Sequence, residues 1–233
     1  ARWEFEGNLK DSVGTMHGSN QGNSRLENGG LVVASNNYVI TAPLKRKLTE
    51  KTLEAWVHLD NLDQRGGAAI SVQTPNGLVF DAIVYGERET QRWMAGSNGF
   101  VRTESFRGTA EIGVKDQPVH FALVYTQDGV ITGYRNGQPY GKPYKSAGLQ
   151  SYDESAVVTF GLRHLPAGGN KHLKARIEKA QLYDFALAPA AVAASAGNGI
   201  NYVSELELVK RMNAVDKTNY QALLAQEKKL RDT

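Results

Sequence analysis

The sequence predicts an all-β fold, an antiparallel β-sandwich, followed by a C-terminal helical extension. Up to Gly197, short alternating apolar runs are separated by Gly, Asn, Asp and Pro, a pattern typical of strands with one buried face. From Val203 to Asp232 the chain has no Gly or Pro and is rich in helix formers. We therefore expect a β domain over residues 1–197, and a helical extension or a linker to a following domain over residues 198–233.

Composition and charge favour one large β domain and exclude several classes of protein. The 233 residues are 41% hydrophobic and include 24 glycines and 10 tyrosines, which suits one large domain with many strands and turns. The net charge of +3 is spread along the chain, so we expect no nucleic-acid partner. The absence of cysteine excludes a disulfide framework and a thiol nucleophile. No apolar stretch approaches the ~18 residues of a membrane span, and the start at Ala1, without Met or a signal peptide, predicts a segment of a longer protein.

The strand pattern is clearest in the middle of the chain. Leu53–Leu59 and Val119–Tyr125 alternate apolar residues as half-buried strands do. Further strands are predicted at Leu31–Val33, Tyr38–Thr41, Ala68–Val72, Leu78–Val84, Val130–Arg135, Val157–Leu162 and Arg176–Tyr183. The dipeptides Asn76-Gly77, Asp128-Gly129 and Asn136-Gly137 suit tight hairpins, so antiparallel meanders are expected and a parallel nucleotide-binding sheet is disfavoured.

Two helices are predicted after the strands. Pro189–Ser195 is expected to form a short helix with Pro in its first turn, ended by Gly197. Between residues 203 and 230, apolar residues recur at three- and four-residue steps, which predicts an amphipathic helix or a helical hairpin bent near Asn213–Asn219. Two interpretations of this segment stay open: it packs on its own domain, or it leads as a stalk into another one.

A search for catalytic patterns finds none. The sequence has no Gly-x-Ser-x-Gly elbow, no His-Glu-x-x-His motif and no phosphate-binding loop. Glu54, Asp81, Glu111 and Glu178 lie in or near predicted strands, where a pair of carboxylates could serve a glycosidase. No Glu-x-Asp-x-Glu arrangement accompanies them. We therefore predict that the protein is not an enzyme and keep polysaccharide hydrolysis as an alternative.

One connection has the composition of a binding site for a polar polymer. The segment Tyr85–Ser97 brings Tyr85, Arg88, Arg92 and Trp93 together in the sequence. Aromatic faces stack on the C–H surfaces of sugars, while arginine pairs with hydroxyls or carboxylates. We predict these four residues as ligand-binding residues. The alternative is that Trp93 fills an edge of the sandwich.

The histidines give a second, weaker candidate. His58 and His120 lie on predicted strands opposite the apolar face, where an exposed or hydrogen-bonded imidazole is expected. His164 and His172 enclose the Gly-rich segment 165–171, and we predict both as ligand-binding residues of this loop. Ordinary loop chemistry is the alternative.

Several short motifs follow one another in a characteristic order: Trp3–Gly7, Thr52–His58 with its Ala-Trp-Val core, Val119–Tyr125, Ile177–Tyr183 and Phe185–Val192. Together they resemble the laminin-G-like modules of the concanavalin A-like lectin/glucanase family. The resemblance covers residues 1–197 and implies a jelly-roll sandwich. Tyr85–Thr103 and Phe160–Asn170 resemble the version found in large exported bacterial proteins with c-type-cytochrome-like domains. This implies a periplasmic, cell-surface or extracellular location and other domains of the same parent chain as partners.

The resemblance also implies a structural calcium ion where the first strand meets the last. By position, the ligands would be Glu6, the carbonyl near Gly30, and Glu178. Both acidic positions hold Glu where the family more often has Asp.

The function predicted from these features is a non-catalytic binding module that recognises a glycan within a larger exported protein. A structural module that contacts neighbouring domains, without a glycan ligand, is the main alternative. Polysaccharide hydrolysis is a third, which fold-level analogy permits but no motif supports.

Overall fold

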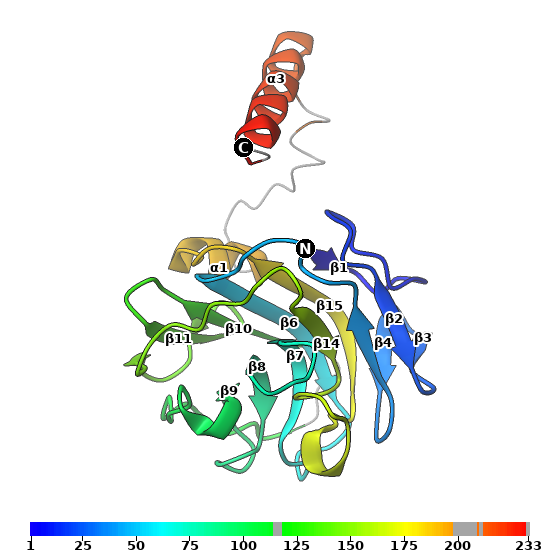
Figure 1. Ribbon diagram of the computed structural model, residues 1–233, viewed down its shortest axis with the longest axis vertical. Coiled ribbons are helices and arrows are strands. Elements are labelled where there is room, and N and C mark those ends of the chain that lie inside the picture. Colours follow the sequence, from blue (N-terminus) through cyan, green and yellow to red (C-terminus); the bar gives the residue numbers. More distant parts are fainter. Residues whose placement is uncertain (114–117, 198–208, 210–211, 232–233) are drawn as a thin grey trace. The chain divides into compact units, whose positions relative to one another are not determined.

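The computed structural model describes residues 1–113, 118–197, 209 and 212–231. The chain divides into two compact units, Ala1–Asn198 and Gly199–Thr233, which are described separately. The first unit is a sandwich of two antiparallel sheets, shown as facing layers in Figure 1. Of the predicted extension 198–233, residues 198–208, 210–211 and 232–233 lie outside the described residues.

Sheet A has nine strands within the described part of the chain. Along the sheet they are β12 (Gln138–Pro139), β11 (Val130–Arg135), β10 (Val119–Tyr125), β6 (Lys51–Leu59), β15 (Ala175–Tyr183), β4 (Gly30–Val33) and β3 (Arg25–Glu27), with β1 (Arg2–Trp3) beside β15 and β13 (Tyr144–Lys145) beside β11. The long central strands β6, β10 and β15 carry the strongest alternation in the sequence, and they anchor the sheet.

Sheet B has six strands among the described residues. In order they are β2 (Gly18–Gln21), β5 (Tyr38–Thr41), β14 (Val157–Phe160), β7 (Gly67–Gln73), β8 (Phe80–Tyr85) and β9 (Trp93–Ser97). β9 is an edge strand, and it is followed directly by the short 3-10 turn η1 (Asn98–Phe100). A second such turn, η2 (Gly169–Lys171), lies before β15.

The core fills the space between the sheets because alternate residues of each strand point inward. Leu53, Ala55 and Val57 of β6 pack with Phe121 and Leu123 of β10 in one buried cluster. Every predicted strand overlaps an observed one, and the antiparallel sandwich is confirmed. The sequence analysis missed β1, β2, β3, β9, β12 and β13, which have at most five residues each and little alternation.

The three predicted hairpins are confirmed. The turns Asn76-Gly77, Asp128-Gly129 and Asn136-Gly137 join β7 to β8, β10 to β11, and β11 to β12. At the last turn both residues have positive φ, 50° for Asn136 and 74° for Gly137, which matches the right-handed twist of the paired strands.

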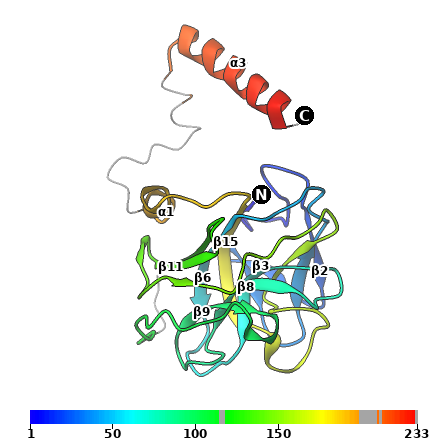
Figure 2. The same cartoon turned by 60° about the vertical axis from the view of Figure 1, so that its left-hand side comes forward.

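The outer faces of the two sheets are covered differently. Helix α1 (Pro189–Ser195) lies against the outer face of sheet A, where Val192 packs on Ala122 and Val124. On the outer face of sheet B, a small apolar cluster includes Phe80 and Met94. Figure 2 shows β9 towards the end of the sandwich remote from α1, so this helix leaves the loops around β9 open.

The second unit contains α3 (Ala214–Arg231). Asn213 caps it, because its Oδ1 accepts the backbone N–H of Asp216 at 2.9 Å. Residue 209 is helical, residues 212–213 are not, and α3 then runs without a break, so the bend predicted near Asn213–Asn219 is observed only as the interruption before Ala214. No helix of the described residues combines the length and hydrophobicity that crossing a bilayer requires.

Candidate functional site

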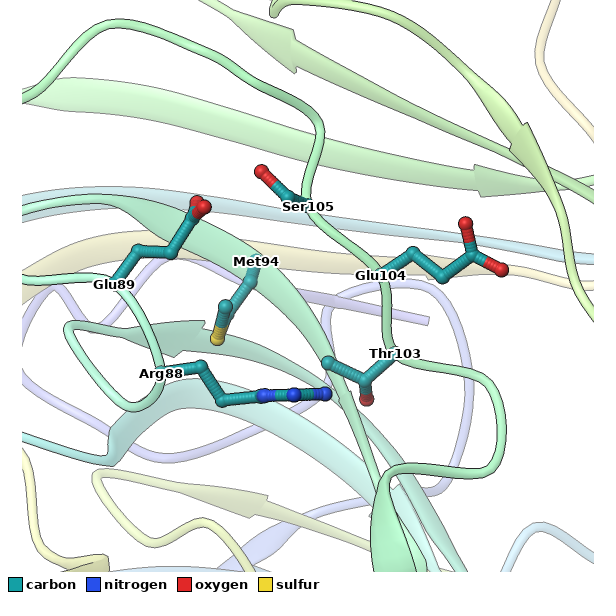
Figure 3. Close-up of a pocket in the computed structure, with 6 residues that line it drawn as sticks. All are labelled: Arg88, Glu89, Met94, Thr103, Glu104 and Ser105. Carbon is teal, nitrogen blue, oxygen red and sulfur yellow. The ribbon is translucent and has the colours of Figure 1, made fainter.

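A pocket of about 470 Å³ lies on the outer face of sheet B, beside the edge strand β9. Two loops form its walls: residues 86–92, which connect β8 to β9, and residues 98–105, which follow β9. Its lining residues are Arg88, Glu89, Met94, Thr103, Glu104 and Ser105. In Figure 3 the guanidinium of Arg88 extends across the pocket towards Thr103, and Glu89 points towards Ser105.

The charged groups of the pocket are not paired. The side chains of Arg88, Glu89 and Glu104 make no hydrogen bond or ion pair with any residue that the structure describes. Their full hydrogen-bonding capacity is therefore available to a ligand. Thr103 is different, because its hydroxyl lies 2.9 Å from Ser97 Oγ and holds the wall in place.

An exposed aromatic ring stands at the edge of this pocket. Phe100 is 42% exposed, and the Arg88 guanidinium lies 5.1 Å from the centre of its ring. The backbone of Phe100 has a φ of +57°, a left-handed conformation that a bulky side chain adopts only at an energetic cost. Gln91 and Arg107, in the flanking segments, also have positive φ. Backbone strain of this kind concentrates at ligand sites.

The pocket is built around one of the four residues predicted in the segment Tyr85–Ser97. Arg88 lines it, whereas Arg92 does not, because its Nε donates to the carbonyl of Gly108 at 3.0 Å. Tyr85 and Trp93 are 0% and 1% exposed. Both side chains point into the core between the sheets, so their burial contradicts their prediction as sugar-stacking rings.

Trp93 instead belongs to the core beneath the pocket. Its ring stacks on Phe121 at 5.3 Å, and its Nε1–H donates to Glu111 Oε1 at 2.9 Å. The alternative interpretation, that Trp93 fills an edge of the sandwich, agrees with these contacts.

The loop that carries His164 and His172 is closed onto sheet B. His164 stacks on Phe80 at 4.5 Å, and its Nδ1 lies 2.8 Å from the carbonyl of Leu165. Burial lowers the pKa of His164 and of His172. Neither histidine lines the pocket. The structure thus places them in loop packing and does not bring them together with Arg88.

The four carboxylates considered for hydrolysis lie in separate places, and each is held by hydrogen bonds or ion pairs within the protein. Asp81 lies 2.9 Å from Arg102 Nε and 3.1 Å from Lys51 Nζ. Glu111 binds Arg135 through both of its oxygens at 2.7 Å. Buried, paired carboxylates of this kind have no access to a polysaccharide.

Glu54 and Glu178 lie on the outer face of sheet A. Glu54 accepts hydrogen bonds from Gln181 and Ser195 and lies 3.1 Å from His120 Nε2. The serine hydroxyl thus contacts the carboxylate rather than the imidazole, so this cluster lacks the hydroxyl–imidazole contact of a nucleophilic triad. Nearby, Trp56 is contacted by the His120 ring and by Lys179 Nζ.

The residues predicted to bind calcium do not form an oxygen cage. Glu178 Oε1 lies 2.6 Å from His58 Nε2 and 2.8 Å from Arg176 Nη1, so the Arg176 guanidinium already pairs with it. Gly30 packs on the backbone of Glu178, but the exposed Glu6 has no recorded contact with either. Among the residues described, no three His, Asp or Glu side chains gather as metal ligands. The donor set therefore does not fit, and calcium binding stays a prediction.

The sequence analysis missed most of the pocket. Glu89 was inside the predicted segment but was not selected, and residues 103–105 were not considered. The feature of the sequence that could have pointed to the pocket is Phe100, an aromatic residue directly after the turn dipeptide Asn98-Gly99. A hydrophobic residue at such a position is exposed unless another segment covers it.

Residues 33–193 match the family model of the concanavalin A-like lectin/glucanases superfamily. Comparison with curated proteins gives no match. Among solved structures, domain 4 of AbnA, an extracellular arabinanase from Geobacillus stearothermophilus solved with arabinotriose, has 18% identity and a TM-score of 0.64, and the match covers 84% of this chain and 97% of that one.

Two further solved structures share only part of their length with this chain. The binding domain of botulinum neurotoxin serotype G has 13% identity and a TM-score of 0.58, covering 84% of this chain and 50% of that one. Trypanosoma rangeli sialidase has 15% identity and a TM-score of 0.56, covering 80% and 30%. At such identities the similarity shows the fold alone.

Proposed function

The chain belongs to the concanavalin A-like lectin/glucanases superfamily and has its antiparallel jelly-roll sandwich, and from this premise we propose that it is a carbohydrate-binding module. The observation that carries the proposal is the pocket beside β9, where an exposed phenylalanine adjoins charged side chains that make no hydrogen bond or ion pair with the described residues.

The chemistry of this pocket suits a sugar. A pyranose or furanose ring offers hydroxyls around its edge and C–H groups on its faces, so it needs polar groups and an apolar surface together. Arg88, Glu89 and Glu104 supply donors and acceptors of both kinds. Phe100 supplies the apolar face, and Arg88 joins the two parts of the site.

The proposal is for binding without catalysis. The strand-borne carboxylates considered for hydrolysis are buried or paired with cations, as described above. The solved arabinanase domain 4 carries arabinotriose in its structure, which supports an oligosaccharide as the class of ligand. An exported protein with further domains is part of the proposal and comes from the sequence resemblance.

The test is binding to a panel of neutral arabinan, xylan and β-glucan oligosaccharides, together with acidic oligogalacturonate and sialyllactose. We expect the wild type to bind at least one of them. Phe100→Ala should weaken that binding by about tenfold, because an aromatic contact contributes ~0.5–1.5 kcal/mol and 1.4 kcal/mol is a factor of ten. Its melting temperature should change little, because the ring is exposed.

Phe185→Ala is the matched control, since Phe185 is 45% exposed and has no part in the pocket. It should keep the wild-type affinity. If the wild type bound none of the oligosaccharides, the proposed carbohydrate-binding function would be contradicted. If Phe100→Ala bound as tightly as the wild type, the proposed site beside β9 would be contradicted. Release of reducing sugar by the wild type would show that the protein is a hydrolase.

A further inference from the structure

One arginine of the loop that forms a wall of the pocket reaches into the core. Arg102 is only 7% exposed, although its neighbours Val101 and Glu104 are exposed. Its Nε donates to Asp81 Oδ1 at 2.9 Å, and its Nη2 donates to the carbonyl of Phe80 at 3.0 Å. The guanidinium therefore spans from the loop to strand β8.

The same guanidinium also holds the loop itself. Its Nη2 lies 3.0 Å from Asn98 Oδ1, at the start of the turn that presents Phe100. The backbone N–H of Arg102 donates to Ser97 Oγ at 2.9 Å, and Thr103 N–H donates to the carbonyl of Phe100 at 3.1 Å. The first two bonds connect the start of the turn to Arg102, and the third holds Phe100 to the residue that follows Arg102, so the position of Phe100 depends on where the arginine is held.

The anchor beneath Arg102 is fully buried. Asp81 is 0% exposed and binds Lys51 Nζ through its second oxygen at 3.1 Å. Lys51 Nζ in turn donates to the carbonyls of Thr49 and Gln150 and lies over the ring of Tyr125. Because these charges are desolvated and closely paired, they resist displacement.

We propose that Arg102 is a positioning residue for glycan binding: held between buried Asp81 and loop residue Asn98, it sets the position of Phe100 and of the pocket wall 103–105. The inference rests on the proposed function. Arg102 itself does not line the pocket, and it acts through the residues that do. A strained turn needs such support, because a left-handed Phe100 would otherwise relax.

The test uses Asn98, because changes at the buried Asp81 or Arg102 risk unfolding the sandwich. Asn98→Ala removes the loop-side acceptor, whereas Asn98→Asp keeps an acceptor of the same shape for the guanidinium. With the panel oligosaccharide that the wild type binds, Asn98→Ala should lose about tenfold in affinity, the equivalent of one hydrogen bond to a charged group. Asn98→Asp should restore binding to within about twofold of the wild type.

The outcomes separate the inference from the function. Absence of binding by the wild type overturns the proposed function and with it this inference. Wild-type affinity in Asn98→Ala overturns the inference alone. Equal weakening in both variants, with a lowered melting temperature, also overturns it, because a general loss of stability then explains the result. Rescue by Asn98→Asp at an unchanged melting temperature supports it.

Discussion

Two loop systems lie on the outer face of sheet B, and they differ in how their polar groups are satisfied. In the loop formed by residues 161–172, Arg163 binds Glu87 and Asn170, Leu165 N–H donates to Gln73, and Lys171 Nζ donates to the carbonyl of Pro166. In the loops around the pocket, Arg88, Glu89 and Glu104 have no such partners in the described structure.

This difference shows where a ligand can be recognised. Both loop systems are rich in Gly, Arg and His or aromatic residues, and both were candidate sites on composition. A side chain that is hydrogen-bonded within the protein has less hydrogen-bonding capacity for a ligand. An unpaired side chain at a pocket can exchange its bound water for a hydroxyl of the ligand. Pairing, rather than composition, distinguishes the closed loop from the open one.

The largest effect is expected below the open loops, at Trp93. Trp93→Ala should lower the free energy of unfolding by ~3–5 kcal/mol, because it removes a buried ring from the core. Urea denaturation followed by circular dichroism measures this change. Trp93→Phe should cost less, because it keeps the stacking on Phe121 and loses only the donor to Glu111.

The assignment of Trp93 to the core would be contradicted if Trp93→Ala kept the wild-type stability and lost its glycan affinity. That result would place the sugar on Trp93 rather than on Phe100, against the burial of its ring.

The sequence predicted the fold more completely than the site. Strands such as β6 and β10 follow from local alternation, and the turn Asn136-Gly137 follows from its own backbone preference. The inward side of the edge strand β9 could not be predicted in this way, because Trp93–Ser97 lacks alternation and its register depends on β8. The same holds for Arg88: three-dimensional packing decides that its guanidinium makes no hydrogen bond or ion pair with the described residues.

The second effect concerns the anchor of the closed loop. Gln73 is fully buried; its Oε1 accepts Leu165 N–H at 2.8 Å, and its Nε2 donates to Thr159 Oγ1 at 2.8 Å. Gln73→Ala should cost ~1–3 kcal/mol of stability, because the partly buried N–H of Leu165 loses its acceptor and the buried Thr159 hydroxyl loses its donor. Glycan affinity at a temperature well below unfolding should stay at the wild-type value.

Gln138→Ala, at an exposed glutamine of β12, is the matched control and should leave the urea midpoint unchanged. A loss of glycan affinity in Gln73→Ala, without loss in the control, would show that the closed loop takes part in binding. The contrast between the two loop systems would then fail.

The smallest effect is a dependence of stability on pH that comes from His164 in the closed loop. Burial lowers the pKa of this imidazole below its ordinary value of 6.5, partly offset by the carbonyl of Leu165, while the charges of Lys171 and Arg163 lower it further. As the pH falls below ~6.5, the unfolded chain therefore takes up the proton first. Stability should be greatest above this pH and should be lost as the pH falls through the lower folded pKa.

The variant His164→Phe tests this pH dependence, because it keeps a ring stacked on Phe80 and removes the imidazole that takes up the proton. Urea midpoints measured from pH 7.5 to 5 should fall less steeply in this variant; a residual slope is expected because the pKa of His172 is lowered in the same direction. Glycan affinity over this range should be flat in both proteins, because His164 does not line the pocket. A different result would be that the glycan affinity of the wild type falls with pH in parallel with its stability, and that His164→Phe removes this fall in affinity. The closed loop would then control the pocket, and the ion pair between Arg163 and Glu87 would be the connection to examine.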